Sequence, residues 1–177
     1  MGYFYIVVNK ETDMANKVDE NMAINIARYF LYRANFDGET ITPLKMQKLL
    51  YYAYVWVLVR KNNHIFDEKF QAWPRGPVLP SLYKKLKKFE GRGIDPSFIE
   101  LGDENDLEEL KKNFPEGTLD IIDKVYDQYI VRNAFELVTM THNEKPWKRA
   151  RQELSPTAHS TTEISDEDII EEYGKRE

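Results

Sequence analysis

The sequence predicts a mainly α-helical protein, a compact single-domain helical bundle with a small β element. Apolar residues recur at helical spacing along most of the chain, and only two short stretches are rich in β-forming residues. The length of 177 residues with a hydrophobic fraction of 42% suits one domain with a real core. We expect this domain to span residues 20–177, after an N-terminal extension of residues 1–19.

The extension and the first helix are predicted from a change of pattern near residue 20. Residues 3–8 are β-branched and aromatic, which favours a short strand, and residues 9–19 are polar and predict a connector. Apolar residues then follow a helical period from Glu20 to Ala34, with Asp19 as an expected N-cap. Gly38 should end this helix.

The second helix, predicted over residues 44–61, has the clearest start signal in the chain. Thr42 is a good N-cap, and Pro43 suits the first helical position, where a missing N–H costs nothing. Residues 51–59 are apolar nearly all round, which is typical of a helix buried on every side. We expect this helix to form the centre of the core.

The next segment combines a β-like stretch, a rigid corner and a third helix. Residues 65–73 alternate weakly and predict two short strands or extended pieces. Residues 73–77, Trp-Pro-Arg-Gly-Pro, predict a rigid corner, because each proline fixes φ and restricts the residue before it. A helix over residues 78–89 follows, with leucines on one face and lysines on the other.

The C-terminal half predicts short helices joined by polar connectors. They are expected over residues 106–114, 119–131, 133–141, 146–151 and 166–173, with a Ser/Thr/Pro-rich connector over residues 155–162. The predicted core residues are Leu49, Leu50, Ala53, Val57, Leu82, Leu86, Val125 and Trp147.

Composition narrows the classes of function. A net charge of −5 disfavours general nucleic-acid binding, whose affinity depends on neutralising phosphates. No apolar run is long enough for a membrane span, and with no cysteine and no signal-peptide pattern we expect a cytoplasmic protein. Charge is uneven, since residues 84–92 and 145–151 are basic and residues 163–172 are acidic. These runs favour steering of a charged protein partner.

No pattern predicts an enzyme, a metal or a cofactor. The three histidines lack the helical spacing of a zinc site, and no glycine-rich phosphate loop is present. His142 next to Thr141 admits a base-and-hydroxyl interpretation, which keeps a His142-dependent hydrolase as an alternative. The simpler interpretation is that His142 ends a helix, where an imidazole is favourable.

Two segments mix tryptophan, arginine, proline and histidine in loop-like positions. Tryptophan and arginine are the residue types that most often anchor protein interfaces. The alternative is that the two tryptophans belong to the core and lock their loops. The predicted partner-binding residues are Trp73, Arg75, Gly76, Pro77, Tyr83, His142 and Trp147.

Four segments carry recognisable motifs: residues 41–53 (ITPLKMQKLLYYA), 66–78 (FDEKFQAWPRGPV), 141–151 with its Thr-His and Pro-Trp pairs, and 164–173. Together they resemble the Panacea domain family, which includes the SocA-like antitoxins and phage-associated GepA-like proteins. The resemblance covers about residues 20–175. The sequence departs from the family in residues 1–19 and in the connector over residues 155–162.

The resemblance implies a mainly helical fold and a function in protein binding. Many members are antitoxins that neutralise an unrelated toxin by direct contact, and one type is a proteolytic adaptor that delivers its toxin to a protease. Others are prophage proteins of unclear role. We therefore expect an antitoxin that binds a cognate toxin and has no enzymatic activity. The alternatives are an adaptor with a protease as second partner and the acidic C-terminal segment as its docking tail, or a prophage-encoded interaction protein. The oligomeric state stays open.

Overall fold

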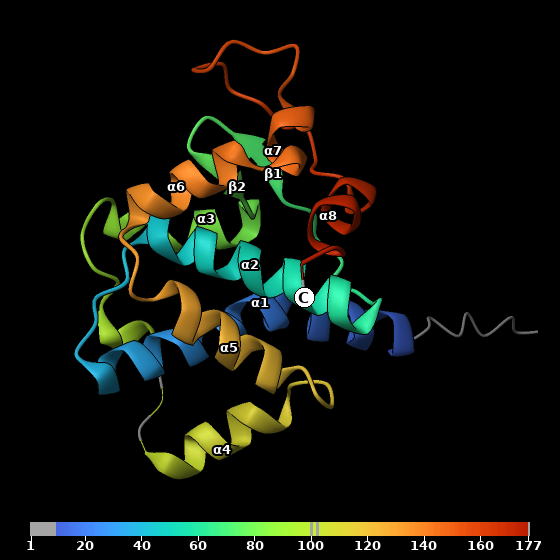
Figure 1. Ribbon diagram of the computed structural model, residues 1–177. Helices are drawn as coiled ribbons and strands as arrows, with labels where there is room; N and C mark the ends of the chain where they lie inside the picture. The colour runs from blue at the N-terminus through green and yellow to red at the C-terminus, as the bar shows by residue number, and fades with distance from the viewer. Residues whose placement is uncertain (1–9, 100, 102, 177) are drawn as a thin grey trace, which may run out of the picture.

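The computed structural model describes residues 10–99, 101 and 103–176, and Figure 1 shows how its helices are arranged. These residues form eight α-helices, two short 3-10 helices and one two-stranded antiparallel sheet. The prediction of a mainly α fold with a small β element is therefore confirmed. The strand predicted over residues 3–8 lies outside the described residues.

Helix α1 (Lys10–Asp37) begins well before the predicted start at Glu20. The predicted connector is helical, and Asp19 lies inside the helix rather than capping it. Residues 10–19 contain neither glycine nor proline, so nothing in them opposes helix propagation. The predicted end is correct, because Gly38 follows α1 with a φ of 74°, a conformation that favours glycine.

Helix α2 (Pro43–Lys61) lies at the centre of the molecule, with α1 and α5 on one side and α6 and the β-hairpin on the other (Figure 1). It starts as predicted, because the Thr42 hydroxyl accepts a hydrogen bond from the Lys45 backbone N–H at 3.3 Å. Residues 45–55 are buried without interruption, as expected for a helix covered on all sides. Each buried large apolar side chain contributes about 1.5–3 kcal/mol to folding.

The small sheet is a hairpin of β1 (Gln71–Trp73) and β2 (Gly76–Val78). Only β1 falls within the segment of residues 65–73, where two short strands or extended pieces were predicted, and residues 65–70 form no strand. The second strand is instead formed by residues assigned to the corner and the next helix. Pro77 misled the prediction, since proline is found in strands only where a ladder hydrogen bond is not required.

Helix α3 (Pro80–Leu86) continues as the 3-10 helix η1 (Lys87–Phe89), so one helical segment runs over residues 80–89. It starts two residues after the predicted position because Val78 belongs to β2 and Pro80 occupies the first turn. Leu82 and Leu86 are buried and all four lysines of the segment are exposed, which confirms the predicted two-faced helix.

The C-terminal half begins with a 3-10 helix that was not predicted, η2 (Pro96–Phe98), and then contains the predicted helices with small shifts at their ends. Their bounds are α4 (Glu104–Lys112), α5 (Leu119–Tyr129), α6 (Ala134–Asn143), α7 (Lys145–Ala150) and α8 (Asp166–Tyr173). Between α7 and α8 the chain runs along the outer edge of β1, where the Ala72 N–H donates to the Thr162 carbonyl at 2.8 Å. The last helix has the bounds that the sequence predicted.

The acidic C-terminal segment, which is the docking tail of the adaptor hypothesis, contains a helix packed against the core. Tyr173 of α8 is fully buried, and its hydroxyl donates to the buried Glu144 carboxylate. On its outer face, Glu171 accepts hydrogen bonds from Lys145 and Arg149 of α7, both at 2.7 Å. The basic run of residues 145–151 and the acidic run of residues 163–172 therefore neutralise each other in part.

One contiguous core joins these helices. Seven of the eight predicted core residues are buried, namely Leu49, Leu50, Ala53, Val57, Leu82, Leu86 and Val125. Trp147 is only partly buried, because it packs against the edge of the core from α7. None of the helices described between residues 10 and 176 has the length and apolarity required to cross a bilayer.

Candidate protein-docking site

The tip of the β-hairpin is a tight turn built around Gly76. Trp73 pairs with Gly76, so only Pro74 and Arg75 connect the two strands. Gly76 has a φ of 91°, which L side chains rarely adopt, and a Cβ there would lie 2.7 Å from the Thr141 Oγ1 atom. Helix α6 is therefore pressed against the back of the turn, and Arg75 extends into solvent on the other side.

A buried lysine holds the hairpin from behind. Lys48 of α2 is completely buried, and its Nζ donates a hydrogen bond to the Pro77 carbonyl oxygen at 2.7 Å. Burial lowers the pKa of Lys48 from 10.5 to about 7, because the charged form loses its hydration. A Cβ on Gly76 would lie 2.9 Å from the same Nζ, so the lysine head and the turn are closely packed.

Helices α6 and α7 brace the outer edge of the hairpin through Trp147. The Trp147 indole Nε1–H donates to the Trp73 carbonyl oxygen at 2.9 Å. The His142 ring stacks on the Trp147 indole with a centroid separation of 3.8 Å. Buried Arg151 donates from a guanidinium nitrogen to the Ala72 carbonyl oxygen at 2.8 Å. These contacts fix the backbone of β1, and hence the direction of the Trp73 side chain.

His142 is placed as a packing group and not as a base beside a nucleophile. Its Nε2 atom is buried and has no hydrogen-bond partner among the described residues. Burial and the positive charges of Lys48 and Arg151 lower the pKa of His142 below 6.5, which favours the neutral ring. The Thr141 hydroxyl donates to the Val138 carbonyl of its own helix at 2.9 Å. This geometry gives the hydrolase interpretation no support.

On the solvent side of the hairpin lies a groove of about 560 Å³, which we call the corner groove. Its floor is apolar and comes from the start of α2, from β2 and from α3, with Leu44, Val78 and Leu86 as contributors. Trp73 and Tyr83 form one wall and meet edge to face at a centroid distance of 4.9 Å. A groove of this size that is mainly apolar is typical of a ligand or peptide site.

Charged side chains surround this apolar floor. Arg75 lines the groove from the hairpin tip, and Lys87 and Glu90 line it from the segment that follows α3. His159 from the connector after α7 packs against Trp73 at a centroid distance of 5.2 Å. The groove is thus formed by segments far apart in the sequence.

The structure separates the seven predicted partner-binding residues into three groups. Trp73, Arg75 and Tyr83 line the corner groove, and Tyr83 remains 42% exposed. Gly76 and Pro77 are buried and shape the turn from behind. His142 and Trp147 are partly buried and support the hairpin through the Trp73 backbone.

Sequence reasoning missed other residues of the groove, chiefly Leu44, Lys87 and His159. Lys87 follows Tyr83 by four residues, so the helical period places the two on one face, and that signal could have identified it. His159 carried no signal, because it belongs to a connector whose path depends on pairing with β1.

No cluster of three or more histidine, cysteine, aspartate or glutamate side chains suited to a metal ion occurs in the described part of the chain. The cations that do lie behind the hairpin, Lys48 and Arg151, donate to backbone carbonyl oxygens. Both side chains therefore bind the hairpin backbone directly.

The fold and the groove define a small helical domain with a mainly apolar groove beside its hairpin. The chain belongs to the family described as antitoxin SocA-like, Panacea domain, whose model matches residues 46–148. Antitoxin SocA of Caulobacter vibrioides (strain NA1000 / CB15N) is 37% identical to it over 59 residues. That alignment covers 33% of this chain and spans 31% of the relative. No solved structure matches the chain.

Proposed function

We propose that the protein is an antitoxin that neutralises a cognate toxin by direct binding and has no enzymatic activity of its own. Membership of a family described as antitoxin SocA-like carries this proposal, and a relative that bears the name Antitoxin SocA supports it. We place this encounter in the cytoplasm, in keeping with the cysteine-free sequence. The partner is a protein, and binding covers its working surface or holds it in an inactive conformation.

The corner groove is the proposed contact surface. Trp73, Arg75 and Tyr83 reach it and are of the residue types that dominate binding energy at protein interfaces. Trp73 is fixed through its backbone carbonyl, which accepts the Trp147 indole N–H. A rigid anchor loses little conformational entropy on binding, which favours affinity. The buried residues behind the turn act through this positioning.

Co-expression with the adjacent reading frame tests the proposal. That frame should arrest growth when expressed alone, and co-expression of this protein should restore growth while the two proteins co-purify. A harmless neighbouring product, or one that stays toxic beside this protein, would remove the basis for an antitoxin function.

Substitutions in the groove then test the contact surface. Arg75→Glu and Tyr83→Ala should each weaken the complex by on the order of thirtyfold, since loss of a hot-spot residue costs at least about 2 kcal/mol. Phe36→Ala is the matched control, because Phe36 is 84% exposed on α1 and does not line the groove. Equal affinity for all three variants by calorimetric titration would place the contact surface elsewhere.

A further inference from the structure

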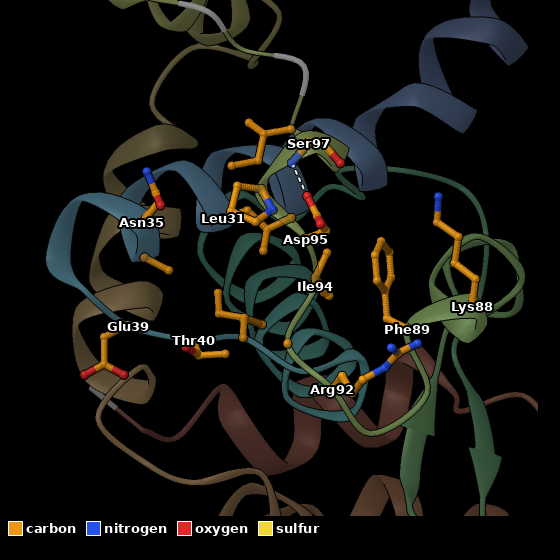
Figure 2. Close-up of a pocket in the computed structure, with 15 residues that line it drawn as sticks. Leu31, Asn35, Glu39, Thr40, Lys88, Phe89, Arg92, Ile94, Asp95 and Ser97 are labelled. Atoms are coloured by element: carbon orange, nitrogen blue, oxygen red, sulfur yellow. Dashed lines mark hydrogen bonds between the residues drawn. The ribbon is translucent and has the colours of Figure 1, made fainter.

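The helical segment over residues 80–89 forms a ridge between two hollows. On one side Tyr83 and Lys87 line the corner groove. On the other side Lys88 and Phe89, with Arg92 of the following loop, line a second hollow of about 670 Å³ that also touches α1. Figure 2 shows these three side chains on one side of that hollow and Asn35, Glu39 and Thr40 on the other. The ridge is therefore accessible from both sides.

The ridge carries a concentration of positive charge without internal neutralisation. Together with the loop that follows it, the ridge has five cations, Lys84, Lys85, Lys87, Lys88 and Arg92, and one carboxylate, Glu90. None of these five side chains forms an ion pair, with nitrogen and oxygen at most 4 Å apart, with any residue that the structure describes. Lys88 lies over the rings of Phe89 and Phe98, at 5.0 and 5.9 Å from their centroids.

The second basic run of the chain differs from the ridge, because it is neutralised in part. In α7, Arg149 pairs with Asp168 and Glu171, and Lys145 pairs with Glu171. On α1, Arg33 pairs with Asp123 and Asp127 of α5. In a protein of net charge −5, the ridge stands out as a positive surface facing solvent.

The two hollows differ in what they offer to a negative ligand. The second hollow has two carboxylates in its lining, Glu39 and Asp95, and Asp95 accepts a hydrogen bond from the Ser97 backbone N–H at 2.7 Å (Figure 2). The corner groove has an apolar floor with Arg75 and Lys87 at its edges. The corner groove has one carboxylate in its lining, Glu90, so its apolar floor and basic edge suit a ligand that combines apolar and acidic groups.

We propose that the corner groove and the ridge bind an acidic amphipathic helix of the partner protein. Apolar side chains of that helix enter between Trp73, Tyr83 and Leu86, and its carboxylates lie against Arg75, Lys84 and Lys87. Lys84 is placed beside Lys87 by the helical period. This inference rests on the proposed function in taking the corner groove as the partner-docking site. A single-stranded nucleic acid would also use the lysines and stack its bases on Trp73 and Tyr83, but the net charge of −5 disfavours it, and the test below includes it.

A synthetic peptide supplies a direct probe. It is a fluorescein-labelled helix of about 16 residues with leucine at positions i, i+3, i+4 and i+7 and glutamate on the opposite face. Three comparison probes isolate its features: the same peptide with lysine for glutamate, the same peptide with serine for leucine, and a single-stranded DNA oligonucleotide of similar length. Binding to the full chain is followed by fluorescence anisotropy at about 50 and about 300 mM NaCl.

The acidic amphipathic peptide should bind most tightly, and its affinity should fall as salt is raised. Lys84→Glu combined with Lys87→Glu should weaken binding by at least about tenfold, since charge reversal replaces attraction with repulsion. The matched control combines Lys124→Glu with Lys175→Glu, which changes net charge equally at exposed sites away from the ridge and should bind as the unmodified chain does. Circular dichroism checks that both double variants are folded.

Three results would overturn the proposal. The first is no binding of the acidic amphipathic peptide, and the second is equal binding of its serine version. The third is tighter, ridge-dependent binding of the oligonucleotide, which would make the ridge a nucleic-acid surface. Growth rescue separates this inference from the proposed function. If the unmodified chain neutralises the neighbouring toxin and the Lys84→Glu/Lys87→Glu variant does so equally well, the ridge inference fails while the antitoxin function stands.

Discussion

Replacing Gly76 by alanine tests the central structural claim about the docking hairpin. The new Cβ would meet two elements at once, lying 2.7 Å from the Thr141 Oγ1 of α6 and 2.8 Å from the Lys48 Cε of α2. It would also force a residue with a side chain to hold a φ of 91°. The substitution therefore adds both steric overlap and backbone strain at the turn.

The expected loss follows from these two contributions. A backbone conformation that L residues rarely adopt costs about 1–3 kcal/mol. Overfilling a packed interior by one methyl group adds about 1–3 kcal/mol more, since Thr141 and Lys48 are both fully buried and have little room to move. We expect Gly76→Ala to lower the free energy of unfolding by about 2–6 kcal/mol, from the sum of these ranges.

Urea unfolding followed by circular dichroism measures this loss, with Gly91→Ala as the matched control. A Cβ at Gly91 would meet nothing within 4 Å, so that variant should stay within about 0.5 kcal/mol of the unmodified chain. If Gly76→Ala were as stable as Gly91→Ala, the turn could not be as tightly packed against α2 and α6 as described.

Two further substitutions probe the support behind the hairpin. Burial places the pKa of Lys48 at about 7, below its unfolded value of 10.5, so between these pH values the unfolded chain binds more protons and stability rises with pH. Lys48→Met should remove this rise in stability, which amounts to at most about 1.4 kcal/mol per pH unit. Urea unfolding at about pH 7 and pH 9 would measure the rise in both chains. If the stability of the variant changed with pH as that of the unmodified chain does, the burial of this amine would be contradicted. Trp147→Phe should keep the stacking on His142 but lose the hydrogen bond to the Trp73 carbonyl, at a cost of about 1 kcal/mol. A thermal melt that shows no loss for Trp147→Phe would argue against that hydrogen bond.

The helices were predictable where local chemistry sets their ends. The Thr42–Pro43 start of α2 depends on a capping side chain and a proline, and both act within one helical turn. The predicted start of α1 was wrong because residues 10–19 contain no glycine or proline to mark a helix boundary, and their polarity resembled that of a connector. Strand β2 was missed because its pairing with β1 depends on tertiary structure, namely on support from Lys48 of helix α2.

The candidate site was predictable in its residue types but not in its geometry. The predicted rigid corner of residues 73–77 forms the hairpin turn, although Trp73, Tyr83 and His159 come together only through the fold. The sequence also could not show that the two basic runs differ in their ion pairing. Only the packing of α8 on α7 reveals that one run is paired and the other exposed.

The anchoring of α8 governs how a role for the C-terminus can be examined. Tyr173 closes the core beside Tyr52, with their ring centroids 6.5 Å apart, so a chain shortened before residue 166 would lose interior packing along with its carboxylates. Loss of activity in such a truncation would report unfolding as readily as a missing recognition signal. Charge reversal at exposed positions such as Glu163 and Glu167 leaves the interior intact. It is therefore the way to ask whether a protease or any other protein recognises this end of the chain.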